Sequence, residues 1–137
     1  MADPAGDVLA HLATEIVALV VDTNLFRGKV REASESLGIP AKAVFVLRTG
    51  GADADAFQGT TLEHFHPSVQ VRVRSTMRTG FGVGEIDADA IREALHHQAI
   101  TGYVDVVASE PIYVEEDEQG SHHWSINVEL LDERARA

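Results

Sequence analysis

The stretch HPSVQVRVRS at residues 66–75 decides the fold that the sequence predicts. Its residues alternate strictly, because valines occupy positions 69, 71 and 73 while Gln70, Arg72 and Arg74 fill the positions between and after them. Successive side chains of a β-strand point to opposite faces of its sheet. Residues 68–75 are therefore predicted to form a strand that buries a valine stripe and holds an arginine stripe away from the core.

Two helices are predicted, one before this strand and one after it. Residues 3–22 repeat apolar side chains at helical spacing, and Asp3 followed by Pro4 is typical of a helix start. The second helix follows the glycine-rich turn TGFGVGE at 79–85, with Asp87 as its predicted N-cap. The predicted inward residues are Val8, Leu9, Leu12, Ile16, Val17 and Leu19 in the first helix, and Ile86, Ile91, Ala94 and Leu95 in the second.

The segment before the valine strand is predicted to hold one more strand and a long loop. The nearly continuous apolar run AVFVLRTGG at 43–51 is typical of an interior strand. Residues 49–67 are predicted to form a loop, and a loop of that length in a small domain is usually functional or mobile. Residues 25–40 fit either a helical face or an irregular connection.

The last third of the chain is predicted to be a β-hairpin. Residues 103–114 run in, the acidic segment 115–121 turns, and residues 122–131 run out with Trp124 on their apolar face. Pro111 interrupts the incoming strand, which favours an edge position or a bulge because proline cannot donate a backbone hydrogen bond.

These elements predict a single domain over 1–137 of the α/β (α+β) class. The order is helix, strand, strand, helix, strand, strand, and a four-stranded, mainly antiparallel sheet with both helices on one face would bury every apolar stripe. The other face would display Arg72, Arg74, His123 and Asn127. That face is either a polar surface beside water or a contact with a neighbouring subunit, and the pattern alone leaves both open.

Composition limits the function classes. The chain has 22 acidic and 11 basic residues and a formal net charge of −11, which disfavours a protein that grips DNA phosphates but permits one that DNA passes without adhering. With no cysteine, disulfides, thiolate metal sites and thiol nucleophiles are excluded. The longest apolar run, IVALVV at 16–21, is too short to span a membrane, and we expect a chain that is not exported.

No motif predicts catalysis, a metal or a cofactor. His64 and His66 would share one strand face, as zinc ligands can, but solvated surface histidines are the favoured interpretation. The acidic segment 115–120 lacks the alternating ligands of a calcium loop, and neither a phosphate loop nor a nucleophile elbow occurs. We therefore expect no enzymatic activity, and a small oligomeric α/β enzyme or ligand-binding module is the alternative from a different class.

Five segments together resemble the tail terminator, or minor capsid, family of long-tailed bacteriophages, and their order matches from about residue 8 to 131. They are NLFRGKV, IPAKAVFVLRTGG, HPSVQVRVRS, ADAIREALHHQ and DEQGSHHWSINVELL. The resemblance implies a structural virion protein without enzymatic activity. Such proteins form homohexameric rings on the head-proximal end of the tail tube, end its polymerisation and join the tail to the head connector; another head–tail joining protein, such as a neck adaptor, is the alternative within this class. Gene transfer particles use similar parts.

The resemblance implies three partners: further copies of the chain, the tail tube protein and a head–tail connector, with DNA passing through the lumen. A ring needs two different complementary patches on each subunit, and the arginine strand and the acidic turn are candidates. Surface ion pairs contribute only about 0–1 kcal/mol each, so apolar residues of the 49–67 loop are expected to add contacts. The predicted interface residues are Arg72, Arg74, Arg78, Phe57, Phe65, Glu115 and Glu116.

Overall fold

The computed structural model describes the chain in five segments. These are residues 3–28, 42–56, 62–76, 81–117 and 121–135, of which 51–56, 62–65, 76, 81–83 and 133–135 are described as backbone only. The elements are α1 (Pro4–Glu15), β1 (Leu25–Arg27), β2 (Ala43–Ala56), β3 (Leu62–Thr76), α3 (Phe81–Leu95), β4 (Asp105–Ala108), β5 (Ile112–Glu116) and β6 (Ser121–Ala135).

The described strands form one sheet in the order β1-β2-β3-β6-β4, and β5 also pairs with β6. β1 runs parallel to β2, and every other pair is antiparallel. The predicted α+β class is correct, but the predicted four-stranded sheet is wrong in detail because the described residues form six strands. One extra strand is β1, which is too short to show a periodicity of its own.

The other extra strand arises because the incoming arm of the predicted hairpin is split in two. β4 pairs with residues 128–131 of β6, and β5 pairs with residues 122–125 of the same strand. Pro111 lies in the break between them, where the missing backbone donor interrupts no ladder. Both pieces lie along one edge of β6, as the proline predicted, but β5 continues through Glu116, so the first two residues of the predicted turn belong to a strand.

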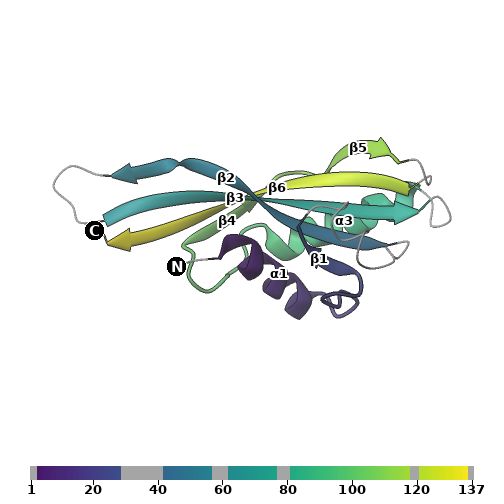
Figure 1. Cartoon of the computed structure of the whole chain (residues 1–137), viewed down its shortest axis with the longest axis horizontal. Coiled ribbons are helices and arrows are strands. Elements are labelled where there is room, and N and C mark those ends of the chain that lie inside the picture. The colour runs from purple at the N-terminus through teal and green to yellow at the C-terminus, as the bar shows by residue number, and fades with distance from the viewer. Residues whose placement is uncertain (1–2, 29–41, 57–61, 77–80, 118–120, 136–137) are drawn as a thin grey trace.

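Both helices pack on the same side of the sheet (Figure 1). The predicted valine stripe is confirmed, since Val69, Val71 and Val73 are buried in the same core as residues of both helices. Trp124 and the alternate apolar residues after it join this core from β6, where Val73 pairs with Trp124. The helix residues buried there are Ala5, Val8 and Leu12 of α1 and Ala88, Ile91 and Leu95 of α3.

The predicted long loop at 49–67 is wrong. β2 extends to Ala56 and β3 begins at Leu62, so the two strands continue with β6 as a three-stranded arm that projects beyond the helices (Figure 1). Two register shifts, between Arg48 and Gly50 and between Ala52 and Asp55, break the alternation on which the sequence prediction relied. Glycine and aspartate are also poor strand formers, so neither pattern nor propensity indicated the arm.

The first helix is shorter than predicted. It ends at Glu15, and Ile16 is extended. The Asn24 side chain accepts a hydrogen bond from the Val20 N–H at 2.7 Å and donates one to the Ala18 carbonyl at 2.8 Å. These bonds hold the backbone of the 16–24 segment in a turn instead of a further helical turn, and Val17 is consequently 89% exposed instead of buried.

The second helix begins earlier than predicted, so two residue roles change. α3 starts at Phe81 and contains Asp87 in its interior, where the carboxylate pairs with Lys42 at 3.1 Å instead of capping the helix. Ile86 is 68% exposed and does not face the core. Gly84 lies within the helix against the Trp124 ring, where a Cβ would be only 2.3 Å from Trp124 Cη2, so this glycine allows close packing and is not part of a turn.

Replacing Asp3 with alanine is expected to lower the free energy of unfolding by about 1 kcal/mol, since Asp3 Oδ1 accepts the N–H of Gly6 as an N-cap. Arg27 donates to Asp3 at 2.7 Å and lowers the pKa of that carboxyl below 3.8. The ion pair therefore stabilises the fold fully above about pH 4, and its contribution is lost as pH falls through the lowered pKa.

Asp3→Asn is the matched variant, because asparagine caps as well as aspartate but has no charge. Denaturant titrations at pH 7 and pH 3 should show a smaller loss for Asp3→Asn than for Asp3→Ala at both values. The difference in free energy of unfolding between the wild type and Asp3→Asn should shrink at pH 3. A difference that grows on acidification would contradict the ion pair.

Candidate functional site: the arginine face of the sheet

The face of the sheet opposite the helices carries the arginines predicted from the 68–75 stretch. Arg74 is not displayed to solvent as predicted, since it is 5% exposed. Its Nε lies 3.5 Å from Asp117 Oδ2, and the same carboxylate oxygen lies 2.8 Å from Nε2 of His123. His123 is 3% exposed, which corrects the expectation that it lies on a solvated face and among surface histidines.

Asp117 is held in position by the chain that follows β5. Its N–H donates to the Ser121 carbonyl at 2.8 Å, and its Oδ1 accepts the Ser121 N–H at 2.9 Å. This local ring of hydrogen bonds places the second carboxylate oxygen over Arg74 and His123, which are cross-strand partners on β3 and β6. The arginine stripe and the acidic segment were predicted to be complementary because of their opposite charge. Arg74 does contact Asp117 of the acidic segment, but this contact lies within one chain and not between subunits.

Arg72 differs from Arg74 because it keeps part of its surface accessible. Its neighbours across the sheet are Phe45 on β2 and Ser125 on β6. Its Nε is buried, and among the described residues no acceptor reaches it. A buried donor without an acceptor costs free energy, while the accessible part of the Arg72 side chain is the part that a neighbouring molecule can reach.

A small apolar cluster flanks Arg72 on the same face. Phe26 of β1 and Phe45 of β2 stack with ring centroids 5.4 Å apart, and Ala43 completes the buried group. Gln70 donates to Ser125 Oγ at 3.0 Å, and Asn127 is exposed as predicted. The face thus combines a buried aromatic pair, a buried charged cluster and one partly exposed arginine, and it is not the uniformly polar surface that alternation suggested.

Among the remaining predicted interface residues, the structure describes the side chains of Glu115 and Glu116 alone. Glu115 and Glu116 are exposed on β5, opposite His123 and His122 of β6. Phe65 belongs to β3, in the part described as backbone only. Arg78 and Phe57 lie outside the described residues.

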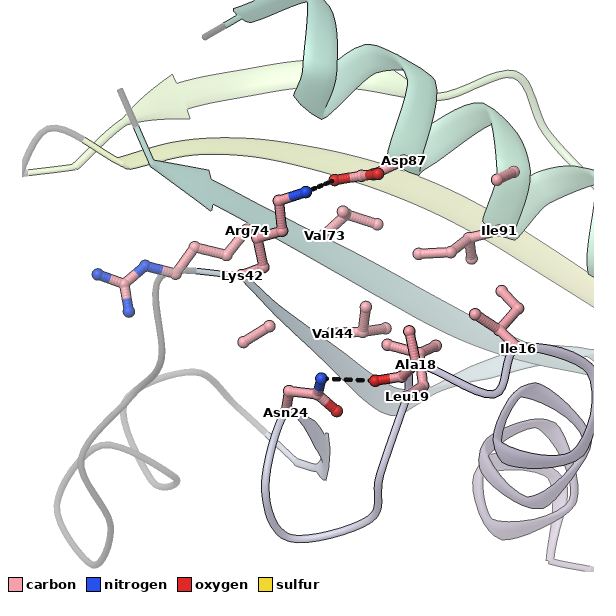
Figure 2. Close-up of a pocket in the computed structure, with 12 residues that line it drawn as sticks. Ile16, Ala18, Leu19, Asn24, Lys42, Val44, Val73, Arg74, Asp87 and Ile91 are labelled. Atoms are coloured by element: carbon pink, nitrogen blue, oxygen red, sulfur yellow. Dashed lines mark hydrogen bonds and ion pairs between the residues drawn. The ribbon is translucent and has the colours of Figure 1, made fainter. Parts of the chain in front are cut away.

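A separate, mainly apolar cavity of about 180 Å³ lies on the helix side of the sheet (Figure 2). Ile16 and Leu19 line it from the segment after α1, Val44 from β2 and Ile91 from α3. The Lys42–Asp87 ion pair lies at its margin, while the side chain of Arg74 points away from it (Figure 2). Among the described residues that line the cavity, Lys42, Arg74 and Asp87 are the titratable ones, and the others make it mainly an apolar packing space.

The histidines of the described segments do not assemble a metal site. His97 Nδ1 lies 3.1 Å from Asp105, and His96 Nδ1 accepts the Ala108 N–H at 3.0 Å. Partial burial lowers the pKa of His96, and neighbouring His97 and Arg92 add to the shift. The His97 hydrogen bond lowers the pKa of Asp105. No group of three potential metal-ligating side chains occurs in the described segments, nor is any described helix long and apolar enough to cross a membrane.

Two residues of this face were not identified from the sequence. Asp117 was one of four consecutive acidic residues, and its hydrogen bonds with Ser121 and its contacts with Arg74 and His123 distinguish it from the exposed Glu115 and Glu116. Phe26 belonged to the ambiguous 25–40 segment. It stacks on Phe45 because β1 pairs in parallel with β2, and a strand of three residues is too short for this pairing to be predicted from the sequence.

Comparison with known proteins places this geometry in context. The model of a family described as bacteriophage tail terminator protein matches residues 19–131. A chain from the structure of the virion of a native gene transfer agent particle has the same fold, with a TM-score of 0.62 at 16% sequence identity over 95% of this chain and 97% of that one. No curated protein matches the sequence.

Proposed function

The chain belongs to the bacteriophage tail terminator protein family, and on that premise we propose that it forms a homohexameric ring that caps the tail tube. It is therefore a structural protein of a phage or phage-like virion, a class that is not typically enzymatic. In our proposal the ring sits at the head-proximal end of the tail, ends tube polymerisation and joins the tail to the head connector. Assembly takes place in the host cytoplasm.

The family match over residues 19–131 is the observation that carries this proposal. The charge supports it, because a net charge of −11 in each subunit repels a duplex that travels along the ring axis. Arg72 supports it as well, since part of its side chain stays accessible on the face opposite the helices, where a neighbouring subunit can contact it.

Negative-stain electron microscopy tests the proposal, with the purified protein mixed with polymerising tail tube protein of its own particle and, separately, with the head connector. We expect a sixfold ring on one end of each tube and tubes that stop growing at that end, because a capped end adds no further tube protein. Rings that bind the connector but leave tube length uncontrolled would instead indicate a neck adaptor. Protein that binds neither structure would refute the tail role altogether.

Arg72→Glu is expected to reduce ring formation at least tenfold in the same assay, because it replaces a cationic donor that the ring is proposed to use with an anion that cannot donate a hydrogen bond. Arg48→Glu is the matched control, since Arg48 is an exposed arginine of β2 that lies opposite Val69 and not opposite Arg72. Thermal melts establish that both variants fold. Rings formed equally well by Arg72→Glu and the wild type would remove Arg72 from the interface.

A further inference from the structure

One side of the sheet ends in β5, a strand with an accessible outer edge. All five of its residues are exposed, and Ile112, Tyr113 and Val114 keep 42–54% of their surface accessible. β5 pairs with β6 along one edge, and no strand of the described segments pairs along the other. An exposed strand edge that carries apolar side chains is a template for a strand from another chain.

An open cavity of about 250 Å³ lies between this strand and α3. Glu85 and Asp89 line it from α3, one helical turn apart, and both are exposed. Neither carboxylate has an ion-pair or hydrogen-bond partner among the described residues. Like charges at this spacing repel each other, so a cation that enters the cavity relieves an existing repulsion.

Aromatic rings form the opposite wall of the cavity. Tyr113 lies edge-on to Trp124 with ring centroids 5.5 Å apart, and both residues line the cavity. A hydrogen bond of 3.0 Å between the Tyr113 hydroxyl and His122 Nδ1 holds the tyrosine ring in place. Aromatic faces attract cations, so the cavity combines the two features that recognise a lysine or arginine side chain. Glu110 also lines it but already pairs with Arg92 at 3.1 Å.

Charge indicates which kind of partner can bind here. Glu115 and Glu116 extend the acidic surface along β5, so DNA is repelled. A second copy of the chain is also disfavoured, since it has twice as many acidic as basic residues. Two of its described basic side chains, Arg27 and Lys42, are already engaged in ion pairs within the chain.

We propose that β5 and the cavity beside it bind an extended segment of a different protein. That segment adds to the open edge of β5 and places a lysine or arginine side chain between Glu85, Asp89 and Tyr113. This surface lies on the opposite edge of β6 from the arginines of β3, and its use does not require a ring.

A peptide titration tests the proposal. The probe is a nine-residue peptide of alternating lysine and valine, acetylated and amidated, and a peptide of alternating glutamate and valine is its counterpart. Trp124 is the single tryptophan of the chain, so its fluorescence and its indole N–H resonance report directly on the cavity. We expect a saturable change with the lysine peptide and none with the glutamate peptide.

The double variant Glu85→Gln/Asp89→Asn should bind the lysine peptide about 2- to 30-fold more weakly, as expected for the loss of two exposed ion pairs. Glu15→Gln/Asp22→Asn changes the net charge equally at exposed positions elsewhere and should bind like the wild type. Equal affinity for all three proteins, or binding that leaves the Trp124 signals unchanged, would overturn the proposal. Either result leaves tail capping intact, because capping is scored by microscopy without the peptide.

Discussion

Replacing Gly84 with valine is expected to lower the free energy of unfolding by about 3 kcal/mol, which corresponds to a decrease in Tm of about 6–12 °C for a domain of this size. A Cβ at this position would lie 2.3 Å from Cη2 and 2.5 Å from Cζ3 of Trp124, and 3.1 Å from Cβ of Ser75. The tryptophan ring is buried and rigid, so α3 must shift away from β6 to accept the new side chain.

Ala90→Val is the control for this substitution. It adds two methyl groups at an exposed position of the same helix, where surface changes usually stay within about 0.5 kcal/mol. Calorimetry or denaturant titration with Trp124 fluorescence measures both variants. If Gly84→Val and Ala90→Val melt together, the close contact between α3 and Trp124 does not exist in solution.

The second large effect is expected from Asp117→Asn, which removes the carboxylate shared by Arg74 and His123. Breaking a fully buried ion pair costs about 3–5 kcal/mol because the remaining charge stays desolvated. Asp117 is 25% exposed while Arg74 is 5% exposed, so water compensates part of the loss and we expect about 2 kcal/mol.

Glu116→Gln provides the comparison, since it removes one negative charge from the adjacent, exposed residue of β5. Urea titrations should place this variant within about 0.5 kcal/mol of the wild type. A loss of stability shared equally by both variants would assign the effect to net charge instead of to the buried cluster.

The parts of the fold predicted from sequence were those with uninterrupted periodicity. The valine stripe of 69–73 and the apolar face of β6 after Trp124 are buried as expected, because a period of two places all of these side chains on one face of the sheet. The arm was missed since two register shifts in β2 interrupt the period. The end of α1 was predicted too late in the chain, because apolar residues continue at helical spacing into the segment whose backbone is hydrogen-bonded to the Asn24 side chain.

The candidate site was predicted less completely than the fold, for a different physical reason. Alternation correctly placed Arg72 and Arg74 on the face opposite the valines, but it carries no information about what covers that face. Burial of Arg74 depends on Asp117, which folds back from the turn after β5, and on neighbours that are distant in sequence. The sequence showed that opposite charges were present but could not show that they meet within one chain.

The order of the strands also has a consequence for synthesis on the ribosome. β6 is the last described strand in the sequence, yet it lies inside the sheet between β3 and the β4–β5 edge. A nascent chain that has emerged only as far as residue 120 lacks β6. One side of β3 then has no partner strand, and β4 and β5 have no strand to pair with. Native structure must therefore form late and through contacts between residues far apart in sequence, which slows folding. Until β6 has paired, the apolar side chains of β3 and β4 lack part of their native cover, and partly folded chains of this kind are prone to aggregate.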